Sequence, residues 1–529
     1  MLRLLLAVLC FSTVLLSCSK NKTKLPHGLN KLNTLTINLS TEPPSLDWNK
    51  ATDRTSFIVI NNIMEGLATY DYKDPKLKVI PALAASWKSF NQSQKWVFTL
   101  KKNVVWSDGK PLTAQHFVDG WKRLLSPKTA SEYAYFLYPI KNAQLFNQGK
   151  LKDFSKVGVS VNKKGQLVVI LEGPKSYFPS LMTHGSTYPV RMDIINKYKD
   201  RWTEPKNIVT LGAYTLNQWE HDKLIVFKKN PNYYGVPAVI PNVLAYMVSE
   251  MSTAVNLFDS KLLDIQAGLP STELSSLKKR KEYRQFSILS TYYYGFNTKK
   301  EPFNKPLVRQ AFSLAVNQKE ITKLLSGGEK PLYSWIPSPM FGHNPSIGLR
   351  FDVKKARKLL DKAGFKDRSK FPKIALSFNT NENHQRIAEN IQAQLKKNLG
   401  VFLELKNEEW KVYLNRLKTD TPHMFRLGWL SDYPDPDDYM SLMLSYSDNN
   451  HTYWKNKKYD NLVLKASRVQ NKKQRLRLYN QAQKLLIETD TPVLPIYSGV
   501  SYMLISPRID YYPFNSMNRA VFKDVRFKK

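Results

Sequence analysis

Cysteine placement constrains this chain more than any other feature. Among its 529 residues, only Cys10 and Cys18 are cysteines, and both lie near the N-terminus. The rest of the chain therefore forms no disulfide and no cysteine-ligated metal site. Its fold has to rest on an apolar core, which 42% hydrophobic residues are sufficient to build. The length favours roughly two to four domains.

The N-terminus has the pattern of an export signal. Arg3 precedes a mostly apolar run over residues 4–16, which is too short to span a bilayer and suits the core of a signal peptide. The run ends at Ser17-Cys18 and resembles a bacterial lipobox, whose cysteine is lipidated and becomes N-terminal after cleavage. We expect residues 1–17 to be a lipoprotein signal peptide and Cys18 to anchor the protein in the periplasm or cell envelope. A plain signal peptide with an incidental cysteine is the alternative.

The charge balance of the chain is strongly basic. Eighty Lys and Arg residues stand against 43 Asp and Glu residues, which gives a formal net charge of +37. The lysine-rich residues 18–33 predict a flexible tether that also lies on anionic lipid. For the other basic residues, either an anionic partner or a general bias towards lysine spread over the surface explains the charge. Zinc-finger, RRM and KH motifs are absent from the sequence, so we expect no nucleic-acid partner.

Strands and helices alternate irregularly along the body of the chain. No linker rich in Gly, Ser or Pro divides it, which favours domains built from interleaved segments. The mixture predicts an α/β or α+β class. The patterns predict strands over 35–40, 95–101, 167–172, 224–228 and 424–430, and helices over 113–125, 307–325, 384–398 and 470–488. Residues 55–69 predict a helix that runs into a turn at Glu65-Gly66.

Several ordered segments together resemble one family, the periplasmic peptide-binding proteins, which are the oligopeptide, dipeptide and nickel receptors of ABC importers. Residues 106–117 (WSDGKPLTAQHF), followed by 121–123 (WKR), are similar to its signature segment. Residues 129–134 (TASEYA) and 428–433 (GWLSDY) are similar to the oligopeptide branch. The likeness covers about residues 34–529, and ordered motifs are more specific than any single motif.

The resemblance implies an α/β, two-lobed periplasmic-binding-protein fold with a discontinuous first domain, an extra third domain and a two-strand hinge. It also implies a monomer without cofactor or enzymatic activity, which captures short peptides and delivers them to the permease and ATPase complex of an ABC importer. The expected boundaries are 34–64, 191–289 and 502–529 for lobe 1 (domain I), 65–190 for extra domain II, and 290–501 for lobe 2 (domain III).

The predicted strand over 424–430 is suited to hold a peptide, which offers an ammonium, a carboxylate and a strand-forming backbone. Period two places Arg426, Gly428 and Leu430 on one face, and Asp432 shares their parity about 20 Å from Arg426. The resemblance assigns Asp432 to the peptide ammonium, Gly428 and Leu430 to backbone pairing, and Arg426 to the carboxylate. The alternative for Asp432 is a loop acid that caps a turn.

Histidine and aromatic residues complete the expected site. His384 lies at the start of a predicted helix, where anions are favoured and where the resemblance implies a histidine that contacts the ligand carboxylate. Trp410, Trp429, Tyr133 and Tyr293 match aromatic residues that line side-chain pockets in the family. Stacking accepts many side chains, which suits a permissive site. A structural role in the core is the alternative for each of these residues.

Two departures from the family pattern leave the preferred peptide length undetermined. Thr52-Asp53-Arg54 stands where oligopeptide receptors carry an acidic residue, a glycine and an apolar residue. No lysine is in register near Leu325-Ser326, where these receptors use one for the carboxylate of long ligands.

Other function classes have less support in the sequence. Hydrolase, P-loop and zinc-protease motifs are absent, and the acidic residues over 432–438 lack the glycine and the terminal glutamate of a calcium loop. We therefore expect neither an enzyme nor a metal site. Two alternatives remain open: a receptor of the same fold for a non-peptide ligand such as haem, a metal chelate or a cell-wall fragment, and a protein that adheres to anionic polymers.

Overall fold

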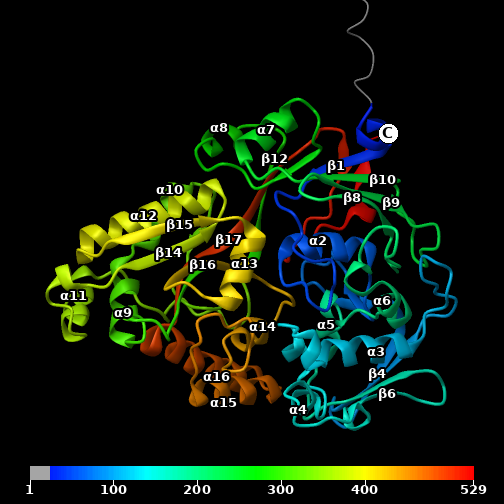
Figure 1. Ribbon diagram of the computed structural model, residues 1–529, viewed down its shortest axis with the longest axis horizontal. Coiled ribbons are helices and arrows are strands. Elements are labelled where there is room, and N and C mark those ends of the chain that lie inside the picture. The colour runs from blue at the N-terminus through cyan, green and yellow to red at the C-terminus, as the bar shows by residue number, and fades with distance from the viewer. Residues whose placement is uncertain (1–23, 529) are drawn as a thin grey trace, which may run out of the picture.

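A computed structural model describes residues 24–528, so the expected signal peptide and Cys18 lie outside the described residues. The fold is mixed α/β, as expected (Figure 1). One large sheet crosses the molecule, and its strands follow the order β15-β14-β16-β12-β17-β11-β1-β10-β9-β8, with β13 beside β17. These strands are β1 (Thr34–Asn38), β8 (Tyr214–Glu220), β9 (Leu224–Lys229), β10 (Asn242–Tyr246), β11 (Ile265–Ala267), β12 (Tyr283–Phe296), β13 (Lys330–Pro331), β14 (Ile374–Asn379), β15 (Leu403–Glu408), β16 (Met424–Leu430) and β17 (Val493–Ile505).

Smaller sheets and the helices surround this large sheet. An antiparallel sheet in the order β4-β5-β7-β6 lies within the expected extra domain. The remaining strands are β2 (Ala68–Tyr70), β3 (Val79–Pro81), β4 (Ala84–Phe90), β5 (Lys95–Leu100), β6 (Val159–Val161), β7 (Leu167–Ile170), β18 (Ile509–Tyr511) and β19 (Arg526–Phe527). The α-helices are α2 (Arg54–Ile63), α3 (Ala114–Leu125), α4 (Ala143–Asn147), α5 (Phe178–Leu181), α6 (Met192–Tyr198), α7 (Met251–Asp259), α8 (Leu274–Leu277), α9 (Pro306–Ala315), α10 (Gln318–Leu325), α11 (Val353–Lys362), α12 (Glu382–Leu399), α13 (Trp410–Thr419), α14 (Pro436–Leu442), α15 (Lys457–Arg468) and α16 (Lys472–Lys484).

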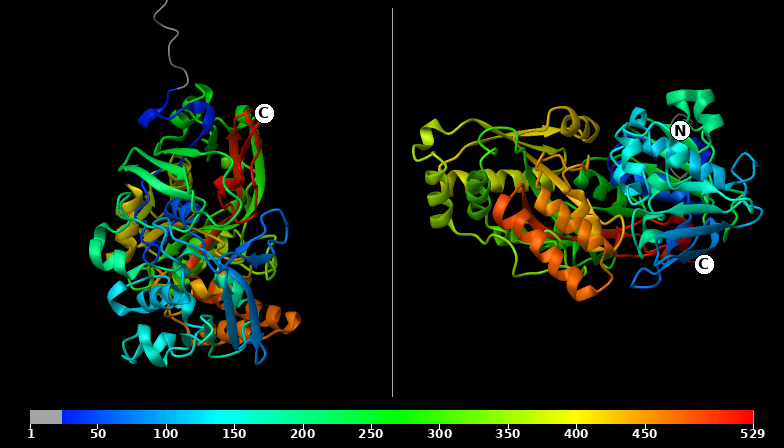
Figure 2. Two further views of the ribbon diagram at one scale, coloured as in Figure 1. Left: turned by 90° about the vertical axis from the view of Figure 1, so that its right-hand side faces the viewer. Right: turned by 90° about the horizontal axis from the view of Figure 1, so that it is seen from below.

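Two long antiparallel strands join the two lobes, which Figure 2 shows as separate masses when the molecule is seen from below. The first half of β12 pairs with the last part of β17, and there β17 also pairs with β11 of lobe 1. The second half of β12 pairs with β16 of lobe 2. The register between β12 and β17 shifts between Ser287 and Thr291, where the strands pass from one lobe to the other.

The buried apolar residues form clusters that correspond broadly to the lobes. One continuous apolar cluster includes Leu35 of β1, Trp106 of the expected extra domain and Val525 near the C-terminus, so that domain shares its core with lobe 1. In lobe 2, separate clusters lie on the two faces of the sheet. Met424 of β16 belongs to one of them, and Phe425 belongs to the other. The period-two pattern expected for β16 is therefore confirmed.

Most expected elements are present, and two predicted helices are interrupted. The helix expected over 307–325 is divided into α9 and α10, because the extended backbone of Val316 ends the first and the Asn317 side chain caps the second. The helix expected over 470–488 begins after its Asn471 cap and passes into a π-helical segment over Leu485–Asp490. An amphipathic pattern does not reveal such internal caps when the apolar face continues across them.

The expected tether overlaps residues that are packed on lobe 1. Leu25 and Leu29 are buried against β9 and β10, through contacts with Leu224, Val226 and Leu244. The Nζ of Lys31 lies 3.2 Å from the buried Asp264 carboxylate. The expectation of a flexible tether is therefore wrong for residues 24–33, because their few apolar side chains find a partner on the sheet.

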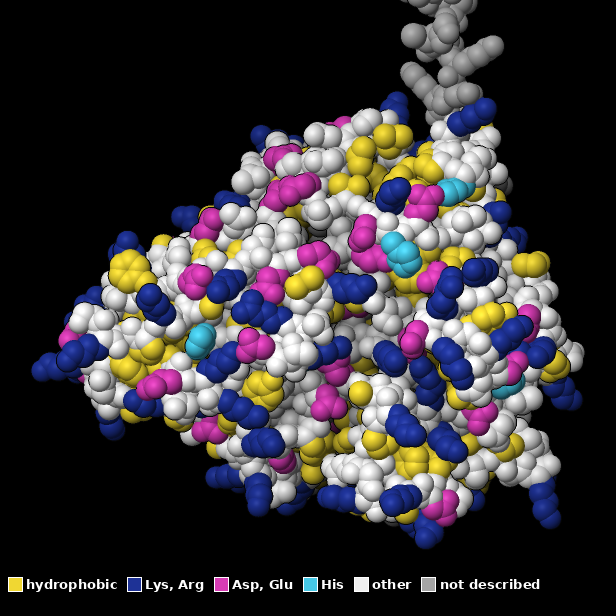
Figure 3. Space-filling model, viewed as in Figure 1, with side chains coloured by type: hydrophobic (Ala, Val, Ile, Leu, Met, Phe, Trp, Pro, Cys, Tyr) yellow, Lys and Arg dark blue, Asp and Glu magenta, His cyan; other side chains and the backbone are white. Residues whose placement is uncertain are grey.

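Basic side chains are scattered over the surface. Figure 3 shows Lys and Arg mixed with Asp and Glu on the face drawn, without one continuous basic block. Within residues 24–528, no helix combines the length and the apolar character that a membrane span needs. In the same range, no group of His, Cys, Asp and Glu side chains is arranged to hold a metal ion.

Candidate functional site

A cavity of about 490 Å³ lies between the two lobes. Lobe 1 contributes the start of α2 and residues 517–520, the expected extra domain contributes Tyr133 and His184, and lobe 2 contributes β16 and the start of α12. Every ligand-binding residue expected from the sequence lines this cavity: Asp432, Arg426, Gly428, Leu430, Trp429, Trp410, His384, Tyr133 and Tyr293.

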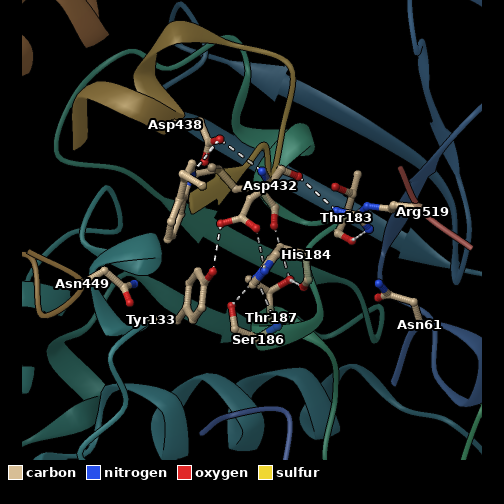
Figure 4. A network of polar contacts seen from close by, with 12 residues as sticks. Asn61, Tyr133, Thr183, His184, Ser186, Thr187, Asp432, Asp438, Asn449 and Arg519 are labelled. Atoms are coloured by element: carbon tan, nitrogen blue, oxygen red, sulfur yellow. Dashed lines mark hydrogen bonds and ion pairs between the residues drawn. The ribbon is translucent and has the colours of Figure 1, made fainter. Parts of the chain in front are cut away.

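The Asp432 carboxylate lies at one end of β16 and is held by two residues from the opposite wall (Figure 4). The Tyr133 hydroxyl donates to Oδ2 at 3.1 Å, and His184 Nε2 lies 3.3 Å from Oδ1. The Ser186 backbone N–H donates to Nδ1 of His184 at 3.3 Å, which fixes the ring with its Nε2 edge towards Asp432. A carboxylate accepts about four hydrogen bonds, so Asp432 retains acceptor capacity for a ligand ammonium.

The backbone of Asp432 connects the site to the C-terminal segment. Its carbonyl accepts a hydrogen bond from Arg519 at 3.0 Å, and Arg519 also donates to the carbonyl of Thr183 at 3.2 Å. Asp432 of lobe 2 therefore contacts both the extra domain and lobe 1. These contacts span the cleft, so they depend on its closure.

A second carboxyl group, that of Asp438, lies behind Asp432. Its Oδ2 accepts the Asp432 backbone N–H at 3.1 Å and the Trp429 indole N–H at 3.2 Å. Burial raises the pKa of Asp438 well above its ordinary value, and the Asp432 charge adds to that increase. The helix after the site is capped by Asp435, which accepts the Asp437 N–H at 2.9 Å. The helix cap is thus supplied by Asp435, whereas the described contacts of the Asp432 carboxylate are to Tyr133 and His184 across the cleft.

An open backbone edge runs along β16 towards Asp432. On one side β16 pairs with β12 along its whole length, but β14 pairs with it only at Met424 and Phe425. The Ser431 N–H donates to Leu289 on the β12 side. Because alternate residues point to opposite edges, the N–H and C=O groups of Gly428 and Leu430 point away from β12. That edge has room for one more strand.

Glycine at position 428 keeps this edge accessible. Gly428 is exposed, and a Cβ atom there would meet protein atoms only at ordinary contact distance, about 3.6 Å from Arg426 and from the Thr291 carbonyl. The protein around it therefore does not require glycine. The missing side chain instead leaves space on the cavity side of the strand.

Arg426 and His384 lie together at the other end of β16. The Arg426 guanidinium lies 4.4 Å from the centre of the Tyr292 ring and donates to the Asn379 side chain at 3.2 Å. The Tyr292 hydroxyl lies 3.3 Å from Nδ1 of His384. Burial, reinforced by Arg426, lowers the pKa of His384 well below its ordinary value, so the ring is neutral at pH 7. Arg426 is therefore the cation at this end of the strand.

The expected aromatic residues differ in how they meet the cavity. Tyr133 and Trp429 face each other across the cleft, with ring centres 6.4 Å apart. Trp410 is half-buried at the start of α13. Tyr293 is buried, and its ring packs edge-on against Trp335 in the lobe 2 core. Within the pair 292–293, it is the preceding tyrosine that shares the cavity face of the sheet with Arg426.

Sequence reasoning missed His184, Arg519, Tyr292 and Arg54, all of which line the cavity. His184 and Arg519 lie far from Asp432 along the chain and belong to no motif that marks a binding role. Tyr292 was missed because period two does not say which of two adjacent tyrosines faces the cavity. Arg54 was noted only as a departure from a family pattern.

Comparison with known proteins places this geometry among solute receptors. The family model described as bacterial extracellular solute-binding proteins, family 5 Middle, matches residues 78–451. The chain is 32% identical over 525 residues to the periplasmic murein peptide-binding protein MppA of Escherichia coli, covering 96% of each chain. It is 34% identical over 492 residues to the periplasmic oligopeptide-binding protein OppA of Salmonella typhimurium, covering 90% of this chain and 89% of that protein.

Solved structures agree with the fold and with the arrangement of the lobes. The E. coli murein tripeptide binding protein MppA superimposes with a TM-score of 0.89 at 32% identity, covering 94% of this chain and 98% of that one. Haemophilus influenzae OppA in complex with RPPGFSPFR gives 0.88 at 29% identity, covering 94% and 99%. The unliganded open form of MppA gives only 0.64, covering 94% and 97%. The lobes described here are therefore not in that open arrangement.

Proposed function

Because the chain belongs to family 5 of the bacterial extracellular solute-binding proteins, we propose that it captures short peptides outside the cytoplasm and delivers them to an ABC importer. The family consists of solute-binding proteins, so the chain is a receptor and not an enzyme. Its partners are then the peptide and the permease and ATPase complex of the importer.

The observation that carries this proposal is the open edge of β16 with opposite charges at its ends. A peptide that adds a strand at Gly428 and Leu430 gains main-chain hydrogen bonds that do not depend on its sequence. Its ammonium then meets the Asp432 carboxylate, and its carboxylate meets Arg426 beside the neutral His384. Tyr133, Trp429 and Trp410 provide aromatic surface for the side chains. Tyr293 supports this wall from the core.

The lipid anchor is a further part of the proposal. Cys18 at the end of the apolar N-terminal run supports lipidation and attachment of the mature protein to a membrane of the cell envelope. Packing of residues 24–33 on lobe 1 leaves residues 18–23 as the connection between the anchor and the folded body. We propose a periplasmic, membrane-anchored monomer with the domain boundaries expected from the sequence.

A receptor for a non-peptide ligand is the competing function. Asp432 argues against it, because an acid with free acceptor capacity at the end of an open strand edge has no role for a ligand that lacks an amine. Calorimetry with tri-alanine and N-acetyl-tri-alanine tests the proposal. We expect acetylation to weaken binding at least 30-fold, since it removes the charge that Asp432 meets. Equal affinities for the two peptides, or no binding of either, would contradict the peptide-receptor proposal.

A further inference from the structure

Arg54 is a cation of the ligand cavity that the proposed binding mode leaves unused. It is the first residue of α2, and its exposed side chain lines the cavity from lobe 1. The adjacent Asp53 is buried, and its carboxylate accepts the Ser56 backbone N–H at 3.0 Å as the cap of that helix. Burial raises the pKa of Asp53. The neighbouring carboxylate is thus engaged with the helix end.

The protein supplies no acidic partner for Arg54 within residues 24–528. Although the side chain is open to the cavity, desolvation by the surrounding cleft walls lowers the pKa of Arg54, and the opposing effect comes from the phenol of Tyr512 and not from a carboxylate. The other two cavity arginines also lack a carboxylate partner, but each donates hydrogen bonds to other protein groups. Arg426 donates to the Asn379 side chain, and Arg519 donates to two backbone carbonyls. Arg54 is therefore a cavity-lining guanidinium without an ion pair to a described carboxylate, and its five N–H donors give it the capacity to bind an anionic ligand group.

The charges of the cavity wall do not match a peptide with neutral side chains. Three guanidinium groups line the cavity, from Arg54, Arg426 and Arg519, but only two carboxylates do, from Asp53 and Asp432. A peptide with free ends brings one ammonium and one carboxylate, which leaves the positive excess unchanged. A ligand with one additional carboxylate neutralises it and gains charge-assisted hydrogen bonds.

We propose that Arg54 forms a subsite for a second ligand carboxylate, so that this receptor prefers peptides with an acidic side chain. This inference rests on the proposed function, because it takes the ligand to be a peptide with free ends. Arg426 on β16 of lobe 2 receives the terminal carboxylate, whereas Arg54 approaches from the lobe 1 wall. Arginine suits the role because its planar fork matches the two oxygens of a carboxylate.

Paired peptides isolate the contribution of this subsite. Tri-alanine is compared by calorimetry with tripeptides that carry Glu or the isosteric Gln at each position in turn. We expect wild-type protein to bind the Glu peptide at least tenfold more tightly than the Gln peptide at one position. Arg54→Gln should reduce that ratio to below threefold. Arg54→Lys should retain part of the preference, since it keeps the charge without the fork.

Lys50→Gln is the matched control. Lys50 is exposed four residues before Arg54, lies outside the cavity and loses the same charge, so its Glu preference should equal that of wild type. Absence of a Glu preference in wild type, or an unchanged preference in Arg54→Gln, would overturn the inference. Equal weakening of Glu and Gln peptides by Arg54→Gln would also overturn it, because Arg54 would then bind the terminal carboxylate.

The two proposals fail in different ways in this experiment. If tri-alanine binds and requires its free amine but no Glu preference appears, the peptide receptor stands and the acidic subsite is wrong. If no tripeptide binds, or if acetylated and free tri-alanine bind equally, the proposed function fails and the inference about Arg54 fails with it.

Discussion

Substitution of Asp432 by asparagine removes one charge from the centre of the proposed site and keeps the shape of the side chain. The carboxylate has 13% of its side-chain surface exposed in the closed arrangement, and its contacts to Tyr133 and His184 come from the opposite wall. A ligand ammonium at this carboxylate is therefore largely removed from water. Asparagine retains a carbonyl acceptor for the Tyr133 hydroxyl, so the substitution mainly deletes the charge.

The expected loss follows from that burial. Removal of one partner of a desolvated charge pair costs about 2–5 kcal/mol, much of it because the other charge is left without a partner. This corresponds to roughly 30-fold to 4000-fold weaker binding of a tripeptide with a free amine. Folding should change little, by less than about 1 kcal/mol, because the carboxylate caps no helix and its contacts form only across the closed cleft.

Calorimetry with tri-alanine measures the affinity, and thermal melts with and without the peptide measure stability and the ligand-induced shift. Asp448→Asn is the control, because Asp448 is an exposed aspartate close in sequence that lies outside the cavity. The control should bind and melt as wild type does. A normal affinity in Asp432→Asn would refute the reasoning, as would a full ligand-induced shift on a lowered baseline, since both assign the residue to folding alone.

Three further outcomes follow from the sequence and the structure. Tyr133→Phe removes the 3.1 Å hydrogen bond to a charged acceptor, so tri-alanine should bind roughly tenfold more weakly or worse in calorimetry; unchanged affinity would exclude a role in closure. Burial lowers the pKa of His451 to about 4 in the folded protein, whereas in the unfolded chain this histidine binds a proton near pH 6.5. The contribution of neutral His451 to the free energy of unfolding is therefore fully present above pH 6.5 and decreases by up to about 3 kcal/mol as the pH falls towards 4. His451→Gln should flatten this part of a plot of melting temperature against pH. Cys18→Ala should move the protein from the membrane fraction to the soluble fraction of its host; firm retention in the membrane fraction would place the anchor elsewhere.

Local pattern was sufficient to predict much of the fold and one wall of the site. The alternation over residues 424–430 predicted β16 with its actual bounds and the two faces of that strand, because side-chain direction along a strand depends only on residue parity. The Thr113 start of α3 was predicted in the same way, since the Thr113 backbone N–H and the His116 ring interact within one turn. Both features depend on residues that are neighbours in the chain.

The resemblance to a known family contributed what local pattern does not contain. It brought the lobe architecture and the roles expected of Asp432, Arg426 and His384, which no periodicity reveals. It did not indicate that residues 24–33 pack on the sheet, because that packing depends on an apolar patch formed by Leu224, Val226 and Leu244 on two later strands.

The sequence by itself therefore determined the strand that lines the cavity and the acid at its end, because both depend on residues a few positions apart. Only the tertiary structure decided which residues meet that acid. Tyr133 is 299 positions from Asp432 in the chain and Arg519 is 87 positions from it. These contacts arise when the two lobes close on strands β12 and β17. A periodic pattern in the sequence holds no information on distances that form when one lobe closes on another. For this reason, His184, Arg519 and Arg54 could be identified as cavity residues only in the folded protein.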